Sequence, residues 1–217
     1  MACRFFAVSL CFGRRTVMEL DHFAVAGETL EAARAHVEAA LGVAMQPGGQ
    51  HARFGTHNTL LGLADGLYLE AIAIDPGAPG PERPRWFDLD RFSGPARLSN
   101  WICRVPDLQA ALSAAPAGAG DIVDLERGAL SWRMAVPASG VLPYDDRFPA
   151  LIQWQGDLHP AAMLAPSGCA LRWLVVTHPE ARALAELCGP LERVVFETGP
   201  SGLRAEIDTP HGMRVLA

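Results

Sequence analysis

The chain of 217 residues predicts an α+β protein made of two tandem βαβββ modules that form a cupped mixed sheet, with a third, partial βαββ(β) module. One short apolar strand, an amphipathic helix and about three further strands follow one another over 18–75 and again over 98–160. A weaker copy spans 161–217. A proline-rich linker, 76–97, separates the first two copies, so the repeat is one of whole modules.

In the first module, an apolar strand over 20–26 leads to a helix. Thr29 is the predicted N-cap, because apolar residues recur at helical spacing after it, and Gly42 is the predicted stop. The later elements are a turn at Pro47-Gly48-Gly49, one or two strands over 52–63 interrupted near Gly55, and a strand over 67–74.

The second and third copies repeat this order more loosely. Pro106 fits the first position of a short helix over 107–115, and Gly189 ends a helix predicted over 179–187. The linker ends at Trp86 and Phe87, which either plug a core or roof a pocket. The remaining predicted strands are 98–105, 122–126, 130–136, 149–155, 171–177, 194–197, 203–207 and 213–216.

Charge and cysteine content narrow the function classes. The net charge is −6, with no cluster of basic residues, which excludes a general nucleic-acid binder. Five cysteines without a CxxC spacing predict free thiols in a reducing cytoplasm. The apolar run at 5–12 is too short to span a bilayer, and 1–17 is expected to be a tail outside the fold. We therefore expect a cytoplasmic protein with a small-molecule ligand and no membrane or nucleic-acid partner.

Two ionisable residues in apolar strands carry the functional argument. His22 lies in the first strand and Glu70 in the last strand of module one, where an ionisable side chain must be paired or functional. Aligning the copies places His22 over Asn100 and Trp173, and Glu70 over Gln153. Equivalent strand positions face equivalently, so His22, Glu70, Asn100 and Gln153 are expected to converge on one cavity around a pseudo-twofold axis.

Each candidate has more than one reading. His22 and Glu70 can bind a metal, act as a general acid–base pair, or form a structural ion pair. His51, His57 and Asn58 lie in a glycine-rich region, where they contact either substrate or the loop itself. His159, before a proline, is a candidate to close over the pocket. The nucleotide-binding glycine motifs and the GxSxG nucleophile motif are absent.

An ordered series of segments over 18–178 is similar to a known family. The segments LDHFAVAG, GGQHARFGTHNTLLGL, YLEAIAID, PRWFDLD and LIQWQGDLHP resemble bacterial glyoxalase-like domain proteins of the vicinal oxygen chelate superfamily. The resemblance implies a divalent metal, such as zinc, nickel, manganese or iron, on the first and last strands of each module. His22 and Glu70 match that ligand pair, whereas Asn100 and Gln153 are neutral and depart from it.

The expected function is therefore that of a glyoxalase-like protein that binds a small oxygen-rich metabolite. Its chemistry would be of lyase or isomerase type, through a divalent metal or through a His22–Glu70 acid–base pair, with Asn100 and Gln153 orienting the substrate. The alternative is a non-catalytic protein of the same fold that sequesters a small molecule. A third reading makes the pair structural within a scaffold that forms a homodimer.

Overall fold

The computed structural model describes residues 17–217, and the expected N-terminal tail lies outside the described residues except for Val17. Its first module pairs β1 with β4 in parallel, β4 with β3 and β3 with β2 antiparallel. Its elements are β1 (Glu19–Ala26), α1 (Leu30–Leu41), β2 (Gln46–His51), β3 (Thr56–Leu63), the 3-10 turn η1 (Ala64–Gly66) and β4 (Tyr68–Ile74).

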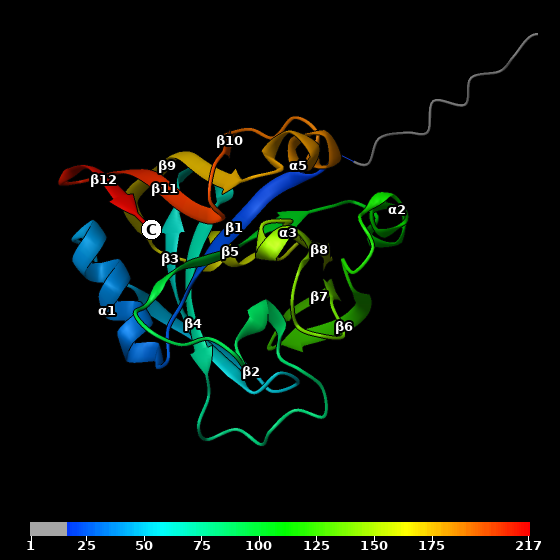
Figure 1. The fold of residues 1–217 in the computed structure, drawn as a ribbon. Helices are drawn as coiled ribbons and strands as arrows, with labels where there is room; N and C mark the ends of the chain where they lie inside the picture. The colour runs from blue at the N-terminus through cyan, green and yellow to red at the C-terminus, as the bar shows by residue number, and fades with distance from the viewer. Residues whose placement is uncertain (1–16) are drawn as a thin grey trace, which may run out of the picture.

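The second module repeats the same pairing. β5 runs parallel to β8, and β8, β7 and β6 follow antiparallel. Its elements are β5 (Arg97–Arg104), α2 (Leu108–Ala114), β6 (Asp121–Arg127), β7 (Leu130–Val136), α3 (Pro143–Asp146) and β8 (Ala150–Gln155). Antiparallel pairing of β1 with β5 joins the modules into one mixed sheet, with β1 near its middle (Figure 1). The predicted α+β fold of tandem modules is confirmed.

Local sequence explains the first helix. The Thr29 side chain accepts a hydrogen bond from the Ala32 amide at 3.1 Å, and Gly42 ends the helix in the left-handed conformation at φ 71°. The predicted place of Pro106 at the first position of the second helix is wrong. The helix begins at Leu108, and Asp107 is its N-cap, because the Asp107 carboxylate accepts a hydrogen bond from the Ala110 amide at 3.0 Å.

The segment Pro47-Gly48-Gly49 is part of β2 and not the predicted turn. The pairing of β2 with β3 shifts register between Pro47 and Gln50, which accommodates a proline that has no amide hydrogen to donate. Gly48 lies so close to Asn58 that a Cβ at this position would come within 2.1 Å of the Asn58 side-chain oxygen. The glycine therefore serves a close approach between two strands.

The third unit has the predicted order of elements, but its strands pair differently from those of the first two modules. Its first strand pairs in parallel with the next strand, β10, and antiparallel with β11, and its start continues the sheet beside β3. Figure 1 shows this unit, orange to red, stacked along one side of the first module. The elements after β8 are α4 (Pro160–Met163), β9 (Pro166–His178), α5 (Ala181–Cys188), β10 (Val194–Thr198), β11 (Gly202–Thr209) and β12 (Gly212–Leu216).

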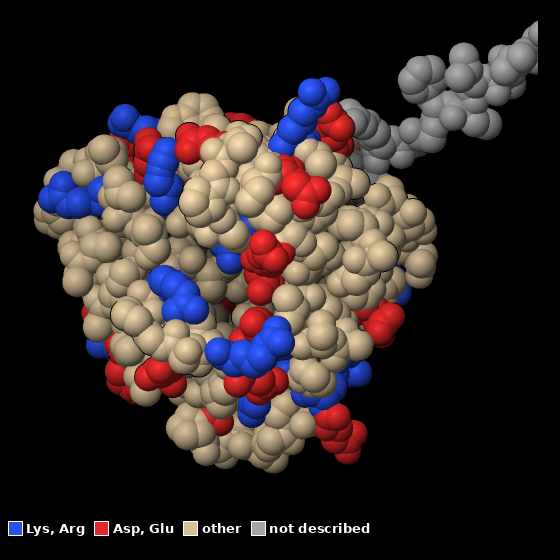
Figure 2. All heavy atoms as spheres, in the orientation of Figure 1, with Lys and Arg blue, Asp and Glu red and all other residues tan. Residues whose placement is uncertain are grey.

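The sheet buries apolar side chains on both faces. On the outer face, strand residues such as Leu61 and Trp101 form one apolar cluster with residues of helices α1, α2 and α5. The inner face carries Ala24, Ile72 and Ile102 and is covered by the 3-10 turn η2 (Trp86–Asp88). Among the described residues no helix is long and apolar enough to cross a bilayer. On the face shown in Figure 2, basic and acidic side chains alternate without a basic patch.

Candidate functional site

A bulge in the first strand creates the centre of the site. Leu20 pairs with Cys103 and His22 pairs with Ile102, so Asp21 is an extra residue in β1. Neighbouring strand residues normally point to opposite faces, but a bulge redirects a side chain. Here the Asp21 carboxylate lies 2.6 Å from His22 Nδ1. Sequence reasoning missed Asp21, although an aspartate directly before the histidine of an apolar strand was the available signal.

Asp21 is fully buried and accepts three hydrogen bonds. Besides His22 Nδ1, the Trp154 indole and His159 Nε2 each lie 3.0 Å from its second oxygen. Burial would raise the pKa of Asp21, but the bonds from His159 and His22 outweigh burial and hold the pKa far below its ordinary value. Asp21 is therefore an ionised anchor that fixes both histidines.

His22 and Glu70 face each other across the inner cavity. His22 Nε2 lies 3.8 Å from Glu70 Oε2, and each residue is only 5% exposed. The His22 ring stacks on Tyr68 at 4.3 Å, which fixes its plane. Burial, with Asp21 and Glu70 nearby, raises the pKa of Tyr68 well above its ordinary value, so the phenol stays neutral. Because Nδ1 faces the carboxylate of Asp21, the Nδ1–H form is favoured and Nε2 is the free nitrogen.

Asn58 positions Glu70. The amide oxygen of Asn58 accepts from the Gly49 amide at 2.7 Å, so its nitrogen is directed to Glu70 Oε1 at 2.5 Å. This arrangement requires the close approach at Gly48 described above. Asn58 was expected to contact either the substrate or the loop, and the bond from the Gly49 amide is such a loop contact. The structure brings it into the cluster as the residue that holds the carboxylate in place.

His51 is a neutral acceptor beside a cation. Burial, together with Arg127, His22 and His57, lowers its pKa to about 3. Its Nδ1 lies 3.1 Å from the Thr56 hydroxyl and its Nε2 lies 3.2 Å from Arg127 Nη1. Since the imidazole is neutral, Nδ1–H donates to Thr56 and Nε2 accepts from Arg127.

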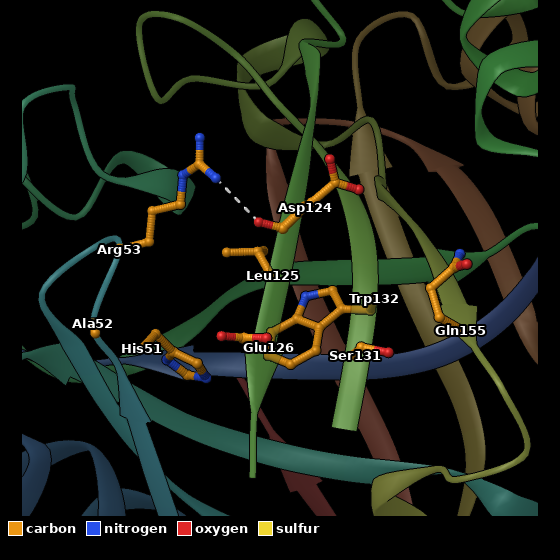
Figure 3. A pocket seen from close by; sticks show the side chains of 9 residues that line it. All are labelled: His51, Ala52, Arg53, Asp124, Leu125, Glu126, Ser131, Trp132 and Gln155. Atoms are coloured by element: carbon orange, nitrogen blue, oxygen red, sulfur yellow. Dashed lines mark hydrogen bonds between the residues drawn. The ribbon is translucent and has the colours of Figure 1, made fainter. Parts of the chain in front are cut away.

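Two spaces that share lining residues lie next to this cluster. The inner cavity holds about 30 Å³, enough for one or two water molecules. It opens beside a wider outer cleft of about 540 Å³ between the β2–β3 connection and β6–β7 (Figure 3), and His51 and Trp132 border both. Trp86 and Phe87 are buried, as a plug requires, and they also roof the inner cavity. Its other lining residues are His22, Asn58, Leu60, Tyr68, Glu70, Arg127, Met134, Ile152 and Trp154.

Three predicted site residues lie elsewhere. His57 lies in β3 next to Asn58, so its side chain points to the opposite face of the sheet and does not line the inner cavity. Asn100 lines a separate space of about 280 Å³ on the other side of Phe87. Gln153 bonds the start of α2, through the Leu108 amide at 3.1 Å and the Pro106 carbonyl at 2.9 Å. His159 reaches the cluster, but it contacts Asp21 behind the cavity.

The strand registers correct one predicted alignment. His22 and Asn100 are equivalent, because His22 pairs with Ile102 and Ala24 with Asn100 across β1 and β5. Ala24 pairs with Glu70, whereas its equivalent Ile102 pairs with Ala150. Ala150, not Gln153, therefore occupies the position of Glu70 in the second module. The expected convergence of four polar residues therefore fails at both residues of the second module, since Asn100 lines the separate space and Gln153 bonds the start of α2.

The donor set fits a divalent metal poorly. Only His22 Nε2 and Glu70 Oε2 face each other as ligands, and within 17–217 no group of three His, Cys, Asp or Glu residues is arranged to hold an ion. The next polar groups are hydrogen-bond donors, the amide nitrogen of Asn58 and the guanidinium of Arg127. A catalytic zinc site uses about three protein ligands. The residues thus do not fit the metal that the resemblance implies.

Comparison with known proteins gives a family and a fold. A family model described as a glyoxalase-like domain matches residues 20–191. A hypothetical protein from Staphylococcus aureus is 13% identical, with a TM-score of 0.56 over 85% of this chain and 88% of that one. Methylmalonyl-CoA epimerase from Mycobacterium tuberculosis is 17% identical, with a TM-score of 0.40 over 64% of this chain and 88% of that one.

A variant of methylmalonyl-CoA epimerase from Streptomyces coelicolor, in complex with 2-nitronate-propionyl-CoA, is 14% identical. Its TM-score is 0.42 over 66% of this chain and 99% of that one. No curated protein matches the chain.

Proposed function

The chain belongs to the glyoxalase-like domain family, and from that premise we propose that it transfers a proton at a carbon next to a carbonyl of a small oxygen-rich metabolite. The observation that carries the proposal is the pair His22 Nε2 and Glu70 Oε2, which lie 3.8 Å apart, with each residue only 5% exposed to solvent. A small cavity of this kind accepts only the reacting part of a substrate.

The roles follow from the hydrogen bonds. The bond to Asp21 keeps the proton of His22 on Nδ1, so the lone pair of Nε2 is free to remove a proton from carbon. The imidazolium that forms would lie between Asp21 and Glu70, and both carboxylates stabilise its charge. The proton then returns to the substrate, either directly or by way of Glu70. Such a transfer gives isomerase or lyase chemistry, and no step requires a metal.

The test is deuterium exchange from solvent. Small ketones, hydroxyketones and oxo acids are incubated with the protein in D₂O, and incorporation next to the carbonyl is followed by NMR. We expect Glu70→Gln to slow exchange by about 100-fold or more, the usual contribution of a positioned acid or base. The matched control is Gln153→Glu, which exchanges an amide for a carboxylate on β8, outside the inner cavity. The rate of deuterium exchange should be unchanged in this variant.

The outcomes separate the alternatives. Exchange that persists in Glu70→Gln and in His22→Asn would refute the acid–base proposal. Loss of deuterium exchange on chelation, with recovery on adding zinc, nickel, manganese or iron, would show that the reaction requires a metal and not the acid–base pair alone. A metabolite that raises the melting temperature of the wild type without any exchange would favour the binding protein.

A further inference from the structure

Arg127 joins the two modules at the rim of the inner cavity. It is the last residue of β6, directly before the left-handed Gly128, and its side chain crosses to β2 of the first module. The side chain passes close to Gly49, where a Cβ would come within 2.8 Å of Arg127 Cδ. The two chain segments thus leave a path for one long side chain into the site.

The charge of Arg127 has no counter-ion in the described part of the chain. Its hydrogen-bond partners are both neutral, His51 Nε2 at 3.2 Å and Asn58 Oδ1 at 3.4 Å. Two arginines that do have a counter-ion give the comparison. Arg85 pairs with Asp90 at 2.6 Å and Arg172 pairs with Asp208 at 2.7 Å. An arginine that lines a cavity, with part of its planar fork unused, is suited to bind a carboxylate.

The neighbouring groups restrict what can reach Arg127. Glu70 and His22 line the same inner cavity, so a ligand anion there meets a carboxylate as well as the guanidinium. Arg127 offsets that repulsion, and a neutral ligand would leave its charge uncompensated. The outer cleft beyond His51 and Trp132 has room for the rest of a ligand.

We infer that the substrate is a small oxo acid whose carboxylate binds Arg127 while the carbon next to its carbonyl faces His22 and Glu70. This inference rests on the proposed function and names its substrate class. Arg127 is in this view the residue that selects anionic substrates over neutral carbonyl compounds.

The test measures binding separately from exchange. Pyruvate and acetoacetate are titrated calorimetrically against the protein beside their neutral amides, pyruvamide and acetoacetamide. The wild type is expected to bind the acids and not the amides at the same concentration. Arg127→Ala should weaken binding of the acids on the order of 30-fold or more, as expected when a charged partner is removed. Arg127→Lys keeps the charge without the fork and should recover part of the affinity.

A matched control lies on the neighbouring strand. Arg133 is on β7, pairs with Asp124 at 3.4 Å and stands opposite Gln153, away from the inner cavity. Arg133→Ala removes the same charge from the protein and should leave binding of the acids unchanged. A loss of affinity in both variants would show a general effect of net charge and would overturn the inference.

The remaining outcomes distinguish the inference from the proposed function. Equal binding of acids and amides, undiminished binding in Arg127→Ala, or no binding by either acid overturns the substrate class. If neutral ketones undergo exchange that depends on Glu70 but is unchanged in Arg127→Ala, the proposed function stands and the inference fails. If the acids bind through Arg127 without exchange in the wild type, the anion site stands and the proton-transfer proposal fails.

Discussion

The two modules share a topology but differ in what they place on the inner face. At equivalent positions the first module has His22 and Glu70 and the second has Asn100 and Ala150. The polar groups of the first module are bonded into one cluster around Asp21, Asn58 and His51. Both polar atoms of the Asn100 side chain, in contrast, are buried and lack a partner among the described residues.

The difference shows that duplicating a fold does not duplicate a site. The second module contributes mainly walls to the inner cavity, such as Met134, Ile152 and Trp132, and one cation, Arg127. The first module supplies the groups able to move a proton. A carboxylate and a histidine on apolar strands need a full set of partners, and both modules supply it here, Asn58 from the first and Trp154 and His159 from the second.

The largest expected difference between the modules is in stability at Asp21. Asp21→Ala leaves His22, His159 and Trp154 without their acceptor, and should lower the free energy of unfolding by about 3–5 kcal/mol. The equivalent in the second module is Ser99, whose hydroxyl makes one bond of 3.3 Å to the Ala24 carbonyl. Ser99→Ala should cost about 1 kcal/mol. Urea unfolding of both variants checks the comparison, and equal losses would contradict it.

A second effect is expected in the pH dependence of stability, from His51. The folded protein protonates His51 only at a pKa of about 3, whereas the unfolded chain does so near the ordinary value of 6.5. The unfolded state therefore binds more protons between these values, and stability falls as pH falls through this window, by up to about 1.4 kcal/mol per pH unit.

His51→Gln should flatten that slope, because glutamine does not take up a proton. The measurement is unfolding by urea at several pH values between 4 and 7. His211→Asn, a substitution at an exposed histidine of the third unit, is the control and should retain the wild-type slope. A slope unaffected by His51→Gln would show that His51 is not held neutral.

The smallest effect is expected at the two buried asparagines of the inner face, one in each module. Asn100→Leu removes two polar atoms that have no partner, so stability should be unchanged or rise by about 1 kcal/mol. Asn58→Leu removes the hydrogen bonds of Asn58 to Glu70 and to the Gly49 amide, and should lower the free energy of unfolding by about 1–3 kcal/mol. Thermal melts of the two variants would rank them, and a larger loss at Asn100 would show that it has an unseen partner.

Much of the fold was predictable because it depends on local pattern. The spacing of apolar residues and the cap at Thr29 predict α1, and alternation in LSWRMAV predicts β7 over Leu130–Val136, as the structure has it. The pairing of the third unit was not predictable. The same order of strands and helix allows β9 to pair with β10 or with a later strand, and only packing against β3 selects between them.

Site residues were predictable where an ionisable side chain lies in an apolar strand. They were not predictable where the register between strands determines which residues are equivalent. His22 and Glu70 stand out as ionisable residues in apolar strands. The apolar pattern of the repeats aligns Gln153 with Glu70, whereas the strand pairing makes Ala150 the equivalent residue. The role of Asp21 depends on a bulge, and Arg127 passes close to a glycine in another strand, and neither feature leaves a periodic signal in the sequence.

The pairing of β1 with β5 inside one chain has a consequence for how the protein behaves on dilution. Both modules contribute residues to the inner cavity, His22 and Glu70 from the first and Arg127 and Ile152 from the second, and the β1–β5 pairing holds them in one sheet. Because one polypeptide carries both strands, dilution cannot separate the two modules from each other.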